Sequence, residues 1–246
     1  MVLVRALDIA FTHDGQQYRI FPALIQDEHD AILVDCGYPH FMKLLQAEAE
    51  RHGTTLEAVG RIIVTHHDMD HIGTLAELKR AYPHLEIIAH ESEVPYLSGE
   101  RKSLRLAQAE ASYASLPEEA RGAADAFMDL LRSIEPAAVD RTVTDGEKLA
   151  QCGGIEIVHT PGHMPGHISL YVPGSRTMIA GDAVVIEEGK LEIANPHYAL
   201  NLEEAVQSVR RLLDYEIDEL ICYHGGRFQG DVRQALLRLL DAYRSA

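Results

Sequence analysis

The chain has 246 residues, of which 46% are hydrophobic and 24% are charged, a composition typical of a globular protein with a full hydrophobic core. The formal net charge of −16 repels phosphate backbones and anionic lipids, so we expect no nucleic-acid or membrane partner. No apolar run approaches the roughly 20 residues that a membrane-spanning helix needs, and the N-terminal residues are typical of a strand rather than of a signal peptide. The three cysteines are far apart and odd in number, which argues against a disulfide framework and favours a cytoplasmic location. We expect residues 1–246 to form a single domain.

The first third of the chain alternates predicted strands and helices. Short apolar or β-branched runs bounded by turn residues predict the strands, and apolar residues at helical spacing predict the helices. The strands are expected over residues 2–11, 18–26, 31–37, 61–65 and 85–90, and the helices over residues 40–52 and 72–82.

Residues 95–138 differ in composition, because they are rich in Ala, Glu, Arg and Leu. We expect two helices here, broken near Pro117. This segment is either a helical insertion that forms a lid over a cleft or a helix hairpin that only packs on the core. If it is a lid, its possible apolar contacts to a substrate are Leu97, Leu104, Leu106 and Phe127.

Strands resume after the insertion. Residues 154–160 form one predicted strand, and residues 168–172 and 177–182 form a predicted β-hairpin. The remaining elements are a helix over 202–214, a strand and loop over 218–226, and a helix over 229–244. Two mixed β-sheets with helices on their outer faces satisfy this order of elements.

The stretch "IIVTHHDMDHIG" places three histidines and two aspartates within residues 66–71, directly after a buried strand. Neutral imidazole and carboxylate are ligands of zinc, manganese and iron. Successive side chains on an extended backbone point in opposite directions. We therefore expect His66, Asp68 and Asp70 on one side and His67 on the other. The structural alternative is a solvated polar loop.

Three further strand ends carry side chains of the same type. His163 and His167 lie in the loop "TPGHMPGH", Asp182 ends the strand "TMIAGD", and His224 ends "ELICYH". A lone Asp at such a place is often a turn former, and a lone His is often a structural residue. Four strand ends that all carry metal-type ligands are more readily explained by one metal centre.

These stretches resemble the metallo-β-lactamase superfamily, from about residue 16 to residue 227. The motif of that family is T-H-x-H-x-D-H, followed by a His in a TPGHTPGH-like loop, an Asp after a Gly at a strand end, and a His before Gly. The chain has "THHDMDH", "TPGHMPGH", "AGDA" and "YHGG". The resemblance implies an α/β fold, a four-layer αββα sandwich with a metal cleft at one edge.

The resemblance also implies two divalent metal ions and assigns their ligands by position. Metal one takes His66, Asp68 and His163, metal two takes Asp70, His71 and His224, and Asp182 bridges the two ions. Asp68 stands where the family has a second histidine. This carboxylate shifts the preference somewhat from Zn, the first expectation, toward Mn or Fe. The loss of one metal is an alternative.

Four residues near the predicted ligands receive supporting roles. We expect His167 to be a hydrogen-bond partner of a ligand and Asp35, after the strand "AILV", to stabilise the ligand-bearing loop or to form a plain turn. The resemblance makes His197 and Tyr198 candidates for substrate contact.

The expected reaction is hydrolysis of a small-molecule ester, lactone or thioester. Two metals that share a water lower its pKa, and the bridging hydroxide would attack a carbonyl carbon, with Asp70 both binding metal and orienting the hydroxide as the catalytic residue. True β-lactamases of the family lack the bridging acid Asp182. The alternatives are a phosphodiesterase, a di-iron redox protein suggested by Asp68, and a non-catalytic binding module. A homodimer is left open.

Overall fold

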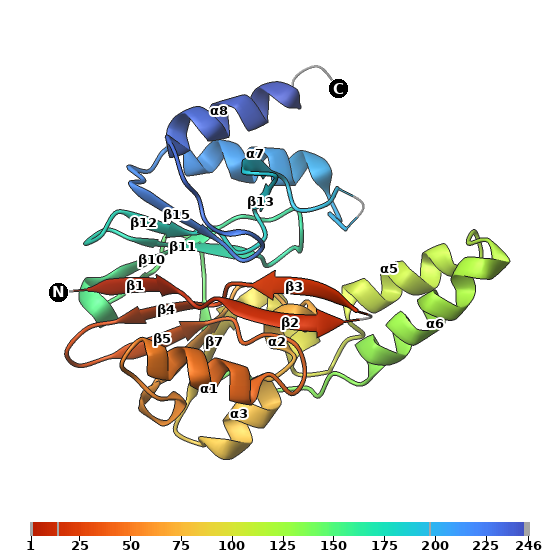
Figure 1. Cartoon of the computed structure of the whole chain (residues 1–246), viewed down its shortest axis with the longest axis horizontal. Coiled ribbons are helices and arrows are strands. Elements are labelled where there is room, and N and C mark those ends of the chain that lie inside the picture. Colours follow the sequence, from red (N-terminus) through yellow and green to blue (C-terminus); the bar gives the residue numbers. More distant parts are fainter. Residues whose placement is uncertain (1, 14, 197, 244–246) are drawn as a thin grey trace.

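The computed structural model describes residues 2–13, 15–196 and 198–243, in which two β-sheets lie between two layers of helices (Figure 1). In spatial order, the first sheet contains β1 (Leu3–Ala6), β4 (Ala23–Gln26), β5 (Ala31–Val34), β6 (Arg61–Val64), β7 (Glu86–His90) and β8 (Arg141–Val143). The second contains β16 (Gly226–Arg227), β15 (Glu219–Cys222), β12 (Thr177–Ile179), β11 (Ile168–Val172), β10 (Ile155–His159) and β9 (Lys148–Leu149). Two hairpins stand apart, formed by β2 (Ile9–His13) with β3 (Gln16–Ile20) and by β13 (Val185–Glu187) with β14 (Lys190–Glu192).

The helices lie on the outer faces of the sheets or in the insertion. Their bounds are α1 (Met42–Arg51), α2 (Met69–Ile72), α3 (Leu75–Ala81), α4 (Val94–Leu97), α5 (Leu104–Tyr113), α6 (Glu118–Arg132), α7 (Leu202–Leu212) and α8 (Val232–Ala242). Single 3-10 turns occupy Leu56–Ala58, Glu91–Glu93 and Gln151–Gly153. Within the described ranges, every helix is too short or too polar to cross a membrane.

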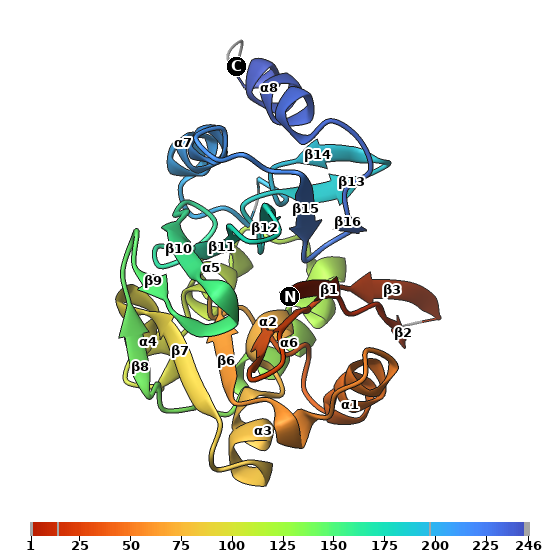
Figure 2. The same cartoon turned by 90° about the vertical axis from the view of Figure 1, so that its left-hand side faces the viewer.

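Apolar side chains on both faces of the strands explain the layers. In β6, Ile62 packs with Leu45 and Leu75 of the outer helices, while its neighbour Ile63 packs against the second sheet, in a cluster that includes Ile179. Strands buried on both faces have near-continuous apolar sequences, which is why "RIIV" does not alternate with polar residues. Figure 2 shows α1 and α3 below the first sheet and α7 and α8 above the second. The predicted αββα sandwich of two mixed sheets is confirmed.

The register of the strands places several carboxyl ends at one edge. β5, β6 and β7 are mutually parallel. In the other sheet, β12 is parallel to β15, and two antiparallel steps through β11 make β10 parallel to β12 as well. The loops that follow β5, β6, β10, β12 and β15 therefore meet at the same edge.

Two predicted strands are each divided in the structure. Residues 2–11 form β1 and β2, and residues 18–26 form β3 and β4. Pro22 explains the second division, because proline cannot donate a ladder hydrogen bond. As a result, β1 and β4 stay in the first sheet while β2 and β3 form a hairpin that reaches toward the insertion (Figure 1).

The predicted helix over residues 72–82 begins earlier, as α2, and restarts as α3. Gly73 lies at the break, and a Cβ atom there would lie 2.3 Å from the backbone nitrogen of Pro39. Only glycine permits this close approach, which holds the loop after β5 against the loop after β6.

The insertion contains α4, α5 and α6, and its last two helices extend beyond the sheets as an arm (Figure 1). The break near Pro117 is where α6 begins.

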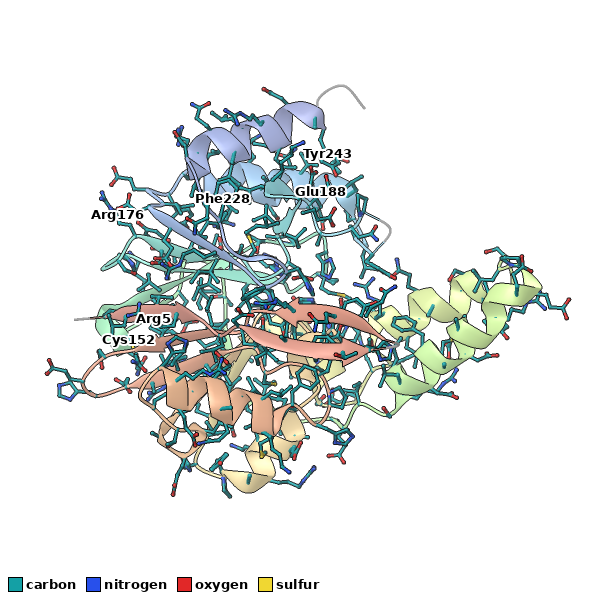
Figure 3. The ribbon with its side chains drawn as sticks, in the orientation of Figure 1. Arg5, Cys152, Arg176, Glu188, Phe228 and Tyr243 are labelled. Atoms are coloured by element: carbon teal, nitrogen blue, oxygen red, sulfur yellow. The ribbon has the colours of Figure 1, made fainter. Side chains whose placement is uncertain are left out.

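All three cysteines are buried free thiols. Cys152 lies at the end of the sheets opposite the arm (Figure 3).

Candidate metal centre

Seven side chains from four strand ends converge at the shared edge of the sheets. They are His66, Asp68, Asp70 and His71 after β6, His163 after β10, Asp182 after β12 and His224 after β15. Their ligand atoms form three overlapping groups, and within each group these atoms lie within 4.8 Å of one another. The structure thus brings together every side chain predicted as a metal ligand.

The first group consists of His66, Asp68 and His163. Asp68 Oδ2 lies 3.0 Å from His163 Nε2 and 3.5 Å from His66 Nε2. All three residues are buried. Their arrangement matches the set predicted for metal one.

The second group consists of Asp70, His71 and His224. Asp70 Oδ2 lies 3.2 Å from His224 Nε2 and 3.6 Å from His71 Nε2. Asp182 lies between the groups, because its carboxylate oxygens are 3.5 Å from His71 Nε2, 3.6 Å from His163 Nε2 and 3.5 Å from His224 Nε2. A carboxylate at this place is able to serve both groups.

Four buried side-chain atoms of these residues have no hydrogen-bond partner among the described residues: His66 Nε2, His71 Nε2, His163 Nδ1 and Asp182 Oδ1. An unsatisfied buried polar atom costs about 1–3 kcal/mol. Divalent cations held by the ligand groups would satisfy His66 Nε2, His71 Nε2 and Asp182 Oδ1, and imidazole with carboxylate suits Zn, Mn or Fe. The residues present therefore fit the metal centre that the sequence predicts, and the identity and number of the ions stay predictions.

The charges of the centre depend on one another. Burial lowers the pKa of His66 well below its ordinary value, and the nearby His71 lowers it further. For His71, burial is outweighed by Asp70 and Asp182, which raise its pKa well above the ordinary value. Burial opposes ionisation of Asp182, but His224 and His71 hold its pKa well below the usual range. A metal ion must therefore displace a proton from His71 when it binds.

Asp35 orients two of these histidines from the loop after β5. Its carboxylate accepts hydrogen bonds of 2.8 Å from the Thr65 backbone N–H, the Thr65 hydroxyl and His71 Nδ1. The Thr65 hydroxyl in turn lies 3.0 Å from His66 Nδ1. With Nδ1 held as a donor in both rings, Nε2 is the nitrogen that the neutral form of each ring offers to a ligand. Asp35 has a left-handed φ of 61° and does more than form a turn.

His167 supports Asp182 through the backbone. Its Nε2 accepts a 2.9 Å hydrogen bond from the Asp182 N–H, and its Nδ1 lies 2.8 Å from the Thr160 hydroxyl. Burial lowers the pKa of His167 to about 3, so the ring is neutral. His167, which was predicted to be a hydrogen-bond partner of a ligand, thus fixes the backbone of the ligand Asp182.

His67 faces away from the other histidines, as the alternation of side chains predicts. Its Nδ1 donates to Glu93, whose Oε2 also accepts the His67 backbone N–H at 2.9 Å. Its Nε2 accepts a 3.3 Å hydrogen bond from the Leu104 N–H. His67 therefore ties the ligand loop to the insertion.

Arg105, from the first turn of α5, is a residue of the site that was not predicted from the sequence. Its Nε donates to Asp68 Oδ1 at 3.1 Å and its Nη2 to Asp68 Oδ2 at 2.6 Å. Burial alone would raise the pKa of Asp68, but His163, His66 and the Arg105 charge hold it well below the usual range. An arginine 37 positions away in a different helix leaves no signal in the local spacing.

A cleft of about 240 Å³ opens onto the cluster. Its walls beyond the predicted ligands are Tyr38, Met69, Arg105, Phe127 and Tyr198. Tyr38, Met69 and Phe127 also line a groove of about 660 Å³ between the β2–β3 hairpin and α6. The cleft therefore shares three wall residues with a larger, mainly apolar and aromatic groove.

The structure places some of the residues predicted as substrate or lid contacts at the cleft and others away from it. Tyr198 is 48% exposed and lines the cleft, whereas His197 lies outside the described residues. Phe127 lines both the cleft and the groove. Leu97 and Leu106 are buried and line another cavity under α4 and α5, which shares Met69 with the cleft, and Leu104 lines neither the cleft nor the groove.

Known proteins resemble the chain along most of its length. The chain is 27% identical over 244 residues to "Probable metallo-hydrolase YflN" of Bacillus subtilis (strain 168), covering 89% of this chain and 86% of the relative. A hydroxyacylglutathione hydrolase of Brucella anthropi is 24% identical over 165 residues, covering 67% of this chain and 46% of the relative.

Solved structures share the fold. A metallo-beta-lactamase family protein from Thermus thermophilus superposes with a TM-score of 0.75 at 23% identity, covering 98% of this chain and 79% of that protein. The model of the metallo-beta-lactamase superfamily matches residues 20–224. The chain therefore belongs to the metallo-β-lactamase superfamily, whose members are metallo-hydrolases.

Proposed function

We propose that this protein is a metal-dependent hydrolase of a small-molecule ester, lactone or thioester, located in the cytoplasm. The observation that supports this most is the set of buried, unpartnered ligand atoms of His66, His71 and Asp182, the last of which lines a cleft. Divalent metal bound there would supply Lewis acidity toward a carbonyl oxygen and lower the pKa of a water molecule.

We assign to Asp70 the role of orienting the attacking water molecule. Its side chain is 15% exposed, against 9% for Asp68 and 6% for Asp182, and it lines the cleft. Its backbone carbonyl accepts a hydrogen bond from the Tyr223 hydroxyl, which holds the start of α2 in place. Asp70 is thus the acid of the cluster best placed to orient a water molecule and accept its proton.

The groove supports an uncharged, partly apolar substrate. Its side chains include Phe11, Tyr18, Phe41, Phe127 and Leu130. An acyl chain or aromatic group that enters this groove would bring its carbonyl carbon to the cleft, because the two share one wall. Burying such a group contributes about 25 cal/mol per Å² of apolar surface.

The alternatives receive less support from the site. Among the described residues that line the groove there is no lysine or arginine, so the groove offers neither cation to the anionic group of a phosphodiester. The di-iron alternative was based on the Asp68 carboxylate, but both oxygens of that carboxylate already accept hydrogen bonds from Arg105.

A hydrolysis panel tests the proposal. The metal-free protein is reconstituted separately with Zn, Mn and Fe and assayed on thioesters, lactones, carboxylic esters and phosphodiesters. We expect metal-dependent hydrolysis of at least one carbonyl class, abolished in Asp182→Ala. Hydrolysis of phosphodiesters alone, or inert protein with every metal bound, would overturn the assignment.

A further inference from the structure

Arg105 holds Asp68 in a bidentate, buried ion pair. The side chains of Arg105 and Asp68 are 6% and 9% exposed, and both carboxylate oxygens of Asp68 accept a guanidinium hydrogen bond. Paired hydrogen bonds of this kind are among the strongest between side chains.

The guanidinium is fixed from other directions as well. Its Nη1 donates to the Tyr198 backbone carbonyl at 2.8 Å and to Gln108 Oε1 at 2.6 Å. The Tyr198 ring lies 5.0 Å from the Arg105 Cζ, within the range of a cation–π contact. Arg105 is therefore a built part of the cleft, held by the insertion and by the loop before α7.

Of the three ligand groups, only the first contains Asp68. Arg105 Nη2 lies 3.3 Å from His163 Nε2, so the guanidinium borders two of the three ligands of the first group. A cation bound there would meet a like charge at short range and would compete with it for Asp68. Within the described part of the chain, the salt bridges of Asp70 and Asp182 involve only histidines.

We propose that Arg105 is a positioning residue that makes the two metal positions unequal. The position formed by Asp70, His71, His224 and Asp182 fills first and tightly. The position formed by His66, Asp68 and His163 fills only when Arg105 releases Asp68, which couples its filling to α5 and the insertion. This inference rests on the proposed metal dependence of the site.

Metal titration of the metal-free protein tests the inference without measuring activity. Zn²⁺ is titrated against a chromogenic chelator into the wild type, Arg105→Gln and the control Arg101→Gln, which removes an exposed arginine of the same segment. We expect one tight equivalent and a second about 100-fold weaker in the wild type and in the control. In Arg105→Gln the second equivalent should tighten by about 10-fold or more, a change of the size seen for residues that support metal ligands.

The outcomes separate the two proposals. Two equivalents of equal affinity in the wild type, or an unchanged second equivalent in Arg105→Gln, would overturn the role of Arg105 alone. A wild-type protein that binds no metal would overturn the proposed function instead.

Hydrogen exchange keeps the inference testable if Arg105→Gln folds poorly. In the wild type, amide exchange of Leu104–Tyr113 should increase only as the second equivalent binds, because Arg105 must leave Asp68. If the amide exchange of α5 stayed constant while both equivalents of Zn²⁺ bound, the proposed coupling between the second metal position and α5 would be wrong. The conservative Arg105→Lys keeps the charge but loses the bidentate geometry, and its second equivalent should bind with an affinity between those of the wild type and Arg105→Gln.

Discussion

Substituting Asp35 by Asn tests how the centre sets the protonation of its histidines. One Asp35 oxygen accepts the Thr65 N–H, and the other accepts both the Thr65 hydroxyl and His71 Nδ1. An asparagine that keeps the first bond turns its NH₂ group toward His71. Two donors then face each other unless the His71 proton moves to Nε2, the nitrogen needed for metal.

The expected magnitude follows from this conflict. Mutating a residue that orients a metal-binding histidine typically lowers metal affinity by about 10- to 100-fold. This loss corresponds to about 1.4–2.8 kcal/mol of binding free energy. Asparagine tolerates the left-handed φ of 61° at this position. We therefore expect a folded protein with weaker metal binding, rather than an unfolded one.

The assay is competition for Zn²⁺ with a chelator, accompanied by urea unfolding of each variant. Asp140→Asn is the matched control. The Asp140 carboxylate also accepts two hydrogen bonds, from the Ile87 N–H and from Lys79 Nζ, but it lies near the start of β7, away from the metal centre. Asp140→Asn should lose stability without losing metal affinity. Metal affinity of Asp35→Asn within about twofold of the wild type would refute the tautomer argument.

Four further predictions follow from the site. Asp182→Ala should abolish activity and lower metal affinity in chelator competition, because Asp182 serves both ligand groups; unchanged metal content would contradict this. His67→Ala should lower the free energy of unfolding by about 2–4 kcal/mol, through two lost buried hydrogen bonds, and leave the tight metal affinity unchanged in the same titration. Phe127→Ala should lower kcat/KM for long acyl substrates by about 5- to 30-fold, or 1–2 kcal/mol, and leave short ones unchanged. The pKa of His167 is lowered to about 3 by burial, so the unfolded state binds more protons between pH 3 and 6.5. The metal-free protein should therefore lose about 2 kcal/mol of stability through His167 between pH 7 and 5, and His167→Gln should lose correspondingly less in urea unfolding.

The sequence was informative where local spacing determines structure. The strand before His66 and the loop of His163 are short-range patterns, so the strand ends and their side chains could be predicted. The alternation that places His67 apart from its neighbours is also local. The family resemblance then supplied the grouping of the ligands, which spacing alone left open.

The sequence was uninformative where contacts depend on the packing of distant segments. Nothing in the local sequence around Arg105 indicates that it reaches Asp68, and nothing around Glu93 indicates that it reaches His67. The break of a predicted helix at Gly73 depends on the approach of Pro39, which comes from a different loop. Such contacts are set by tertiary packing, which propensity and periodicity do not encode.

Metal content and hydrolysis, measured in the same samples, decide whether bound metal is needed for the reaction. The metal-free protein is loaded stepwise with Zn²⁺, and bound metal and the rate of thioester, lactone and ester hydrolysis are followed in the same samples. We predict that hydrolysis of at least one carbonyl substrate rises with bound metal and disappears when a chelator removes it. Hydrolysis that is independent of bound metal, or fully loaded protein that hydrolyses none of these substrates, would contradict it.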